Sequence, residues 1–160
     1  RFGMRMELHQ PYENLTYYGR GPFENYIDRY SGAFIGRYED KVENQFYWYI
    51  RPQETGNKTD VRWLTLLDSG GLGVKITGLQ PISFSALHFS PEDLDPGLTR
   101  KLQHTIDIVP QKNIFLHVDL KQRGLGGDNS WGMYPHNEYR LLDKKYTYSY
   151  MKKVRIKMII

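Results

Sequence analysis

The chain has 160 residues, of which 39% are hydrophobic, 25% are charged and none is cysteine, and its formal net charge is +4. These values are typical of one globular domain without disulfides or thiolate chemistry, and the apolar runs are far shorter than the ~20 residues of a membrane-spanning helix. The basic residues are scattered rather than gathered into one stripe, which argues against a nucleic-acid-binding protein.

The first elements are predicted to be strands, because apolar residues recur at every second position. This alternation begins at residues 2–8. Two later segments are predicted to be buried strands, QFYWYI at 45–50 and VRWLTLL at 61–67, with a polar loop between them. Their tryptophans, Trp48 and Trp63, are therefore expected in the core.

Two more alternating segments, at 71–78 and 81–89, precede the only helix signal. The tetrapeptide SPED at 90–93 combines an N-cap serine, a first-turn proline and an acidic residue three positions after the cap. The Pro-Gly pair at 96–97 ends this helix within about one turn.

Alternation returns at 106–108 and 114–120, and the last pair of strands is predicted at 138–142 (EYRLL) and 146–151 (YTYSYM). The tyrosines of the last segment share one face, which favours a half-exposed packing surface over a sugar platform. Short strands with a turn signal every 8 to 12 residues or so predict an all-β fold with at most one short helix.

Common catalytic and metal-binding motifs are missing from the sequence. The Gly-x-Gly pairs lack the third glycine of a dinucleotide-binding loop, the serines lack a nucleophile elbow, and the five histidines never take the spacing of a metal-binding helix. No metal site is predicted. The many carboxylates could supply a glycosidic acid and base, but sequence alone does not pair them.

Three segments carry a specific resemblance: YYGRGPFENYIDR at 17–29, RPQETGNKTDVRW at 51–63 and GLGGDNSWG at 124–132. In this order they resemble the C-terminal (small-chain, domain 5-type) region of large bacterial β-galactosidases of the lactose-operon type. The resemblance implies an antiparallel β-supersandwich of the galactose-mutarotase-like fold. Residues 1–151 would be the second half of that domain, and residues 152–160 a basic and apolar tail without a clear counterpart.

The resemblance also implies a function, the hydrolysis of terminal β-D-galactosides with retention, carried out by a multidomain enzyme. In that family both catalytic glutamates lie on a TIM barrel of about 250 residues, which this chain is too short to contain. The chain alone is therefore expected to be inactive. Magnesium and sodium are implied for the parent enzyme's barrel, and no cofactor is predicted for this chain.

The expected partners are a β-galactoside, contacted on its aglycone side, the TIM barrel and other domains of the parent enzyme, and further copies in a homo-oligomer. No nucleic acid and no membrane is expected. The resemblance places the protein in the bacterial cytoplasm or periplasm, and this stretch of sequence shows no secretory signal.

One residue is predicted to touch substrate. In the family, the tryptophan of the Gly-Gly-Asp-x-Ser-Trp loop forms a wall against which the leaving-group sugar stacks, and the matching residue here is Trp131. An indole suits the apolar face of a pyranose. Gly126 and Gly127 would permit a tight loop, and Asp128 and Ser130 would fix it through bonds to its amides. The alternative is a Trp131 folded back into the core.

Four polar residues crowd one turn after the first motif, namely Glu24, Asn25, Asp28 and Arg29. They invite a catalytic interpretation. We expect a structural role instead, because the turn at Pro22 needs side chains to satisfy its buried amides.

Two other functions stay open at this point. A sugar epimerase of the mutarotase type would share the fold but need a general base and acid, whose motifs are not found here. A free-standing carbohydrate-binding module would need an exposed platform of two or more aromatic residues.

Overall fold

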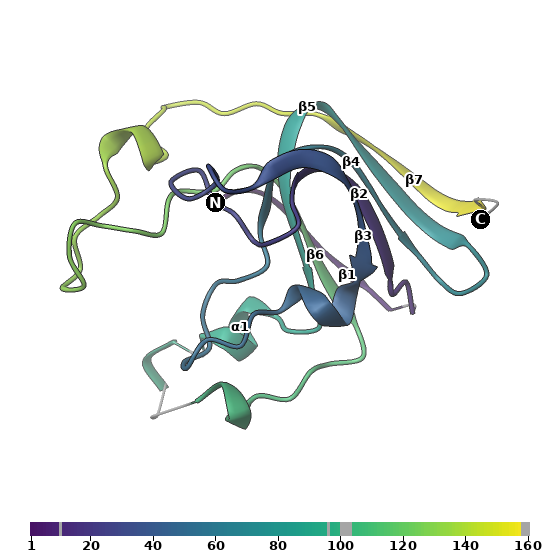
Figure 1. The fold of residues 1–160 in the computed structure, drawn as a ribbon, viewed down its shortest axis with the longest axis horizontal. Coiled ribbons are helices and arrows are strands. Elements are labelled where there is room, and N and C mark those ends of the chain that lie inside the picture. Colours follow the sequence, from purple (N-terminus) through teal and green to yellow (C-terminus); the bar gives the residue numbers. More distant parts are fainter. Residues whose placement is uncertain (10, 96, 100–103, 158–160) are drawn as a thin grey trace.

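The computed structural model describes residues 1–9, 11–95, 97–99 and 104–157, which form seven strands in one antiparallel sheet (Figure 1). The strands are β1 (Phe2–Leu8), β2 (Asn14–Gly21), β3 (Phe34–Lys41), β4 (Lys58–Leu67), β5 (Leu72–Leu87), β6 (Ile114–Lys121) and β7 (Tyr150–Lys157). The described helices are α1 (Pro91–Leu94) and the 3-10 turns η1 (Val42–Gln45), η2 (Gly97–Thr99), η3 (Thr105–Asp107) and η4 (Asn137–Tyr139).

The long strand β5 organises the sheet, whose order is β1-β6-β5-β4-β2-β3. One edge of β5 pairs with β4, and the other edge is divided between two strands: residues 72–78 pair with β7 and residues 83–87 with β6. Between Thr77 and Ile82 the register with β4 shifts, so residues 78–81 bulge out of the ladder. This bulge separates the two alternating segments predicted from the sequence.

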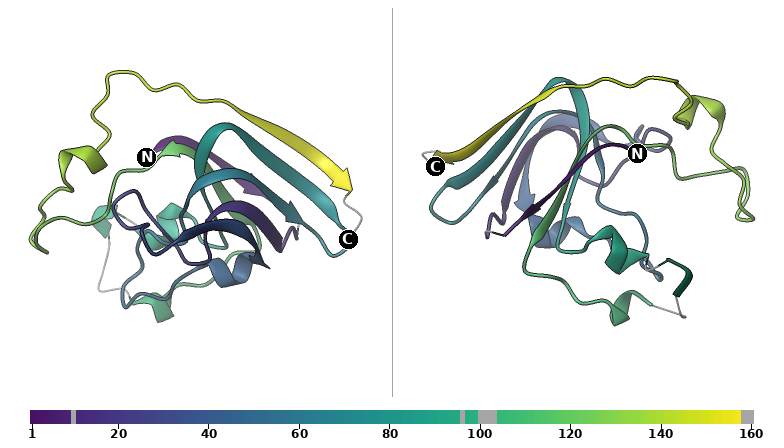
Figure 2. Two further views of the ribbon diagram at one scale, coloured as in Figure 1. Left: turned by 45° about the horizontal axis from the view of Figure 1, so that its top comes forward. Right: turned by 180° about the vertical axis from the view of Figure 1, so that it is seen from behind.

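One side of the curved sheet carries the core and the connecting segments. The two views in Figure 2 place α1 and the turns η1 and η3 on this side. The main cluster combines buried apolar side chains of four strands and η1: Leu15, Tyr17, Val42, Val61, Leu64, Leu66, Val74, Ile76, Ile82, Phe84, Ala86, Ile114, Leu116 and Val118. A second cluster lies around α1 and consists of Phe46, Leu87, Phe89, Leu94 and Ile108.

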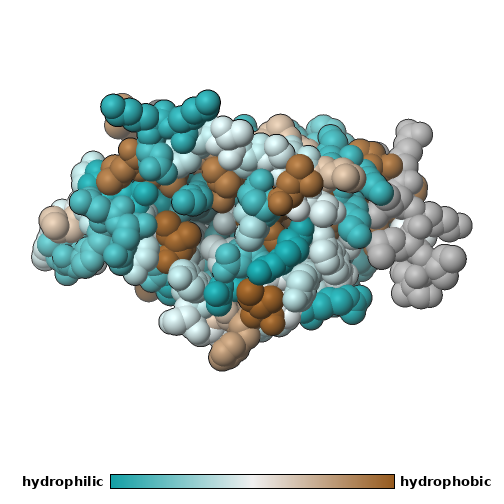
Figure 3. All heavy atoms as spheres, turned by 90° about the horizontal axis from the view of Figure 1, so that it is seen from above, coloured by the Kyte–Doolittle hydropathy of each residue, from teal (hydrophilic) through white to brown (hydrophobic). Residues whose placement is uncertain are grey.

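The opposite side of the sheet is mixed in character. Seen from above, hydrophobic side chains are scattered among hydrophilic ones (Figure 3). Residues 122–149 leave the sheet after β6 as a long arm and return to it as β7 (Figure 1). This arm carries the tryptophan loop.

Much of the predicted structure is confirmed, including the all-β, antiparallel class with one short α-helix. Strands cover the alternating segments 2–8, 61–67 and 114–120. Helix α1 has the predicted capping box, in which the Ser90 hydroxyl accepts from the Asp93 amide and the Asp93 carboxylate accepts from the Ser90 amide. Of its two stop residues, Gly97 has φ +74° and Pro96 lies outside the described residues.

The predicted strand at 45–50 is wrong. Its backbone makes isolated contacts instead of a ladder: the Tyr47 amide donates to Thr55 Oγ1 at 3.1 Å, and the Thr105 amide donates to the Ile50 carbonyl at 3.3 Å. Phe46 packs under α1, whereas Trp48 is 59% exposed and not in the core as predicted. Trp63 is half-buried on β4, with the Lys75 ammonium 5.2 Å from its ring centre.

The other wrong strands lie in turns and in the arm. Residues 105–107 form η3 and residues 137–139 form η4, while 140–149 lie outside the strands. Only the end of the predicted strand 146–151 is in β7. Its tyrosines are half-buried and pack across β1, with Tyr146 and Tyr148 at 5.2 and 5.9 Å from the Phe2 ring. Residues 152–157 of the expected tail belong to β7, and 158–160 lie outside the described residues.

Candidate functional site

Trp131 projects from the arm. Its side chain is 91% exposed, so the alternative in which it folds into the core does not apply. The Trp131 amide donates to Asn129 Oδ1 at 2.9 Å, and Gly132 follows with φ +100°, a value that favours glycine. Residues 129–132 thus form a local turn from which the indole projects into solvent.

The loop is tied to the turn of the first motif. Asp28 Oδ2 accepts a hydrogen bond from the Gly126 amide at 2.8 Å. A Cβ at Gly124 would lie 2.6 Å from the Asp28 carboxylate, so a glycine is needed for this approach. The Gly124 amide also donates to the Tyr139 carbonyl at 2.8 Å, which joins the two sides of the arm.

Of the four residues predicted to support the loop, the two glycines and Asp128 make close contacts within the described structure, whereas Ser130 does not. Asp128 pairs with the side chain of His136, with 2.7 Å between Oδ1 and Nε2, and this hydrogen bond raises the pKa of His136. A Cβ at Gly127 would meet the Met133 carbonyl oxygen at 2.3 Å. Within the described part of the chain, Ser130 has no side-chain hydrogen bond, and Asn129 binds the loop amide instead.

Glu24 is the centre of a dense hydrogen-bond network. Its carboxylate accepts from the Tyr49 hydroxyl, from Thr55 Oγ1 at 2.9 Å and from the Gly56 amide at 2.8 Å, and it pairs with Arg29 at 2.6 Å. Burial raises the pKa of Glu24, but these hydrogen bonds outweigh it, and the pKa lies below its ordinary value. A carboxylate held in this way is ionised and has its lone pairs in use.

Asn25 is 1% exposed and joins the turn to β4. Its side-chain amide donates to the carbonyls of Arg20 and Phe23, and Oδ1 accepts from the amide of Thr59 at 2.9 Å and from its hydroxyl at 2.5 Å. The backbone of Asn25 bonds Asn57 in both directions. Within this turn, Glu24 pairs with Arg29 and Asn25 binds β4. The fourth residue, Asp28, binds the tryptophan loop.

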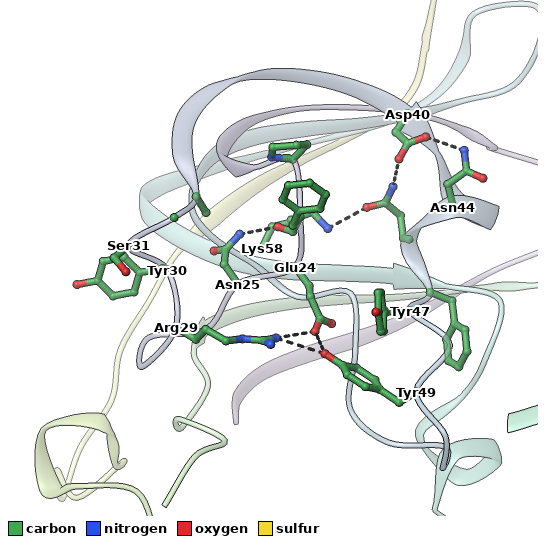
Figure 4. A pocket seen from close by; sticks show the side chains of 16 residues that line it. Glu24, Asn25, Arg29, Tyr30, Ser31, Asp40, Asn44, Tyr47, Tyr49 and Lys58 are labelled. Atoms are coloured by element: carbon green, nitrogen blue, oxygen red, sulfur yellow. Dashed lines mark hydrogen bonds and ion pairs between the residues drawn. The ribbon is translucent and has the colours of Figure 1, made fainter. Parts of the chain in front are cut away.

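A cavity of about 670 Å³ opens beside Glu24, between the turn at 22–33 and the segment 40–49 (Figure 4). Lys58 lines it although this residue is only 2% exposed. Its Nζ donates to Gln45 Oε1 at 3.0 Å and to the Gly56 carbonyl at 3.4 Å. Burial lowers the pKa of Lys58 to about 8, against the opposing charges of Glu24 and Asp40.

No cluster of three or more His, Asp or Glu residues suited to a metal ion occurs among the described residues. Among these residues, none of the helices could serve as a membrane-spanning segment. The candidate site consists of the exposed tryptophan loop, the turn that is hydrogen-bonded to it, and the cavity that the same turn lines.

Sequence reasoning missed several of these residues. Asn129 lies inside the recognised loop, and its place two positions before Trp131 is a signal for an Asx turn. Lys58 lay in a segment predicted to be a polar loop, although the structure begins β4 there. Tyr49 and Thr55 reach Glu24 from 25 and 31 residues away, which no local pattern could reveal.

The comparisons with known proteins agree on one family. The model of the family described as "Beta galactosidase small chain" matches residues 1–151. A protein named beta-galactosidase from Priestia megaterium is 38% identical over 152 residues, which cover 94% of this chain and 14% of that protein. A beta-galactosidase from Streptococcus thermophilus is 36% identical over 141 residues, covering 88% and 13%.

A more distant beta-galactosidase, from Photobacterium profundum, is 33% identical over 157 residues, which cover 97% of this chain and 14% of that protein. The chain thus spans only 13% to 14% of the length of these relatives.

Proposed function

The chain belongs to the beta galactosidase small chain family, and on that premise we propose that it is a non-catalytic C-terminal part of a retaining β-galactosidase. Its role is to complete the aglycone side of the active site with Trp131. The parent enzyme hydrolyses terminal β-D-galactosides, and its catalytic glutamates lie on a TIM barrel outside this chain.

The observation that carries the proposal is that Trp131 is exposed and that its loop is held by hydrogen bonds. The indole is 91% exposed, so its face is free to contact a partner outside this chain. The loop that presents it is held at Gly126 by Asp28 and at Trp131 by Asn129. A ring fixed in this way can meet the C–H face of a sugar without losing much freedom on binding.

The mechanism assigned to the parent is double displacement. One glutamate protonates the glycosidic oxygen, a second forms the galactosyl-enzyme, and water then releases galactose. Trp131 acts on the departing sugar: it stacks against the leaving group before cleavage and against an acceptor sugar during transfer. It moves no proton, so its removal affects aglycone and acceptor binding more than the chemistry of a good aryl leaving group.

Two carboxylates of the first motif make structural contacts, which supports an accessory role for that motif. Glu24 is saturated with donors, and Asp28 is engaged by the tryptophan loop. On the basis of the family resemblance, magnesium and sodium are assigned to the parent's barrel. Assembly into a homo-oligomer is likewise assigned to the parent.

The test is Trp131→Phe in the intact enzyme. We expect weaker binding of acceptor sugars and less transfer to them, with little change in the hydrolysis of an aryl β-galactoside. Trp48→Phe is the matched control, because Trp48 is also exposed but lies on another segment. Unchanged acceptor kinetics in the Trp131 variant would contradict the aglycone-binding role of Trp131.

A further inference from the structure

We propose that the cavity beside Glu24 is a sugar-binding site in its own right, which takes the ring of a neutral monosaccharide unit. Lys58 donates to a sugar hydroxyl and Tyr47 stacks on the ring. This inference does not depend on the proposed role of Trp131, because none of the residues that line the cavity belongs to the tryptophan loop.

Lys58 supplies the first argument, an unused donor. An ammonium group carries three N–H bonds. The described residues provide two acceptors, Gln45 Oε1 at 3.0 Å and the Gly56 carbonyl at 3.4 Å. A buried donor without a partner is costly, and the lowered pKa of Lys58 reflects this burial. A ligand hydroxyl in the cavity would accept the third bond.

The second argument comes from the exposed aromatic side chains at the edge of the cavity. Phe23 and Tyr47 line the cavity with exposed fractions of 76% and 60%, and Tyr30 joins them at 40%. The Tyr47 ring lies 4.6 Å from that of Tyr49, whose hydroxyl is fixed by Glu24. Exposed rings above a polar floor match the two faces of a pyranose, one with C–H groups and one with hydroxyls.

The charges decide between a neutral ligand and an anion. Two carboxylates, Glu24 and Asp40, line the same cavity as the two cations Arg29 and Lys58. The formal charges therefore cancel, and an anion would meet two carboxylates on entry. A polyhydroxylated, uncharged ring satisfies the free donor without this repulsion.

Hydrogen bonds within the chain hold the side chains of the cavity wall in place. The hydrogen bonds of Glu24 hold the turn, and Asp40 accepts from Asn44 at 2.8 Å and from Gln45 at 2.7 Å (Figure 4). Gln45 in turn orients the Lys58 ammonium. Such preorganisation lowers the entropic cost of binding.

The experiment measures access to Lys58 in the intact protein. Lysines are labelled by reductive methylation in the presence of D-galactose, a neutral hexose, and the rate at each lysine is read by peptide mass spectrometry. Lys58 lines the cavity and is only 2% exposed, so bound sugar should slow its labelling by roughly tenfold at about 10 mM sugar if Kd is about 1 mM. Exposed Lys112 is the internal control and should keep its rate.

Two variants locate the sugar. Tyr47→Ala removes the stacking ring at an exposed position and should abolish the protection of Lys58. Trp131→Ala should leave the protection unchanged, as should Tyr18→Ala, which removes a partly exposed ring outside the cavity. Saturable protection that follows this pattern supports the proposal.

The remaining outcomes overturn it. Protection by sodium acetate and not by galactose would make the site an anion site. Absence of protection at about 100 mM sugar, protection that survives Tyr47→Ala, or a Lys58 that is never labelled because the cavity is closed would each reject a sugar site at this position.

Discussion

Asp28 and Gly126 are 98 residues apart in the sequence, and the carboxylate of one accepts the amide hydrogen of the other at 2.8 Å. This contact links the two segments that carry the strongest family resemblance. The turn after β2 thereby positions the loop that presents Trp131. Asp28 is a positioning residue, because its carboxylate contacts the loop backbone and not the indole.

Asp28→Ala is expected to loosen the loop. Loss of a hydrogen bond to a charged acceptor costs about 1.5–3 kcal/mol in a well-ordered site, and here the cost falls on local opening of residues 124–132 rather than on the sheet. Amide hydrogen exchange at Gly126 should accelerate while that of β4 stays constant. Asp28→Asn keeps an acceptor oxygen and should restore most of the protection; equal exchange in the alanine variant and the unchanged protein would remove Asp28 from this role.

Glu24 is expected to stabilise the fold in a pH-dependent way. Its pKa in the folded chain lies below the ordinary value, so the folded form binds fewer protons than the unfolded form. The stabilisation is therefore complete above the ordinary glutamate pKa of about 4.3 and is lost as the pH falls through the lower folded value. Urea unfolding of Glu24→Gln at pH 7 and pH 3 should give a loss of stability at pH 7 that shrinks at pH 3; equal losses at both pH values would contradict it.

His117 is expected to make the stability of the fold depend on pH in a neighbouring, less acidic range. Burial is the main cause that lowers the pKa of His117 to about 4, with the positive charges of Arg1 and Arg5 adding to it. The unfolded histidine takes up its proton near its ordinary pKa of about 6.5, so stability should fall as the pH drops from there to about 4. His117→Gln cannot titrate and should flatten this part of the stability curve, measured by thermal unfolding; an unchanged slope would exclude His117 as its source.

How far the sequence predicts the fold depends on where a segment buries its side chains. Residues 2–8 and 61–67 alternate, and both pair as strands, because a sheet with one buried face imposes that period. Residues 45–50 are as apolar as a strand, yet Phe46 packs under α1 and Trp48 stays exposed. An aromatic run can serve loop packing as well as a sheet, and local pattern does not distinguish the two.

The candidate site is predictable only in part for a similar reason. Trp131 stands in a recognisable motif, but the local sequence left open whether its side chain is exposed or packed in the core, and the structure shows it 91% exposed. Three partners of Glu24 lie 25 to 32 residues away from it, and Lys58 is held by Gln45, which lies 13 residues away. Such contacts depend on sheet register and on the path of loops, which composition and periodicity do not encode.

The two adjacent glycines before Asp128 should differ sharply in their tolerance to a side chain. A Cβ at Gly127 would lie 2.3 Å from the Met133 carbonyl oxygen, which is backbone and cannot rotate away, whereas a Cβ at Gly126 finds its nearest neighbour, Asp28 Oδ2, at an ordinary 3.5 Å. Gly127→Ala should therefore displace the loop and reduce transfer to acceptor sugars in the intact enzyme as far as Trp131→Ala does.

Gly126→Ala is the matched control and should retain most of that transfer. Because neither position belongs to the main core cluster, thermal unfolding of both variants should stay close to that of the unchanged protein. Equal acceptor kinetics for the two variants would show that the close packing at Gly127 does not set the position of Trp131.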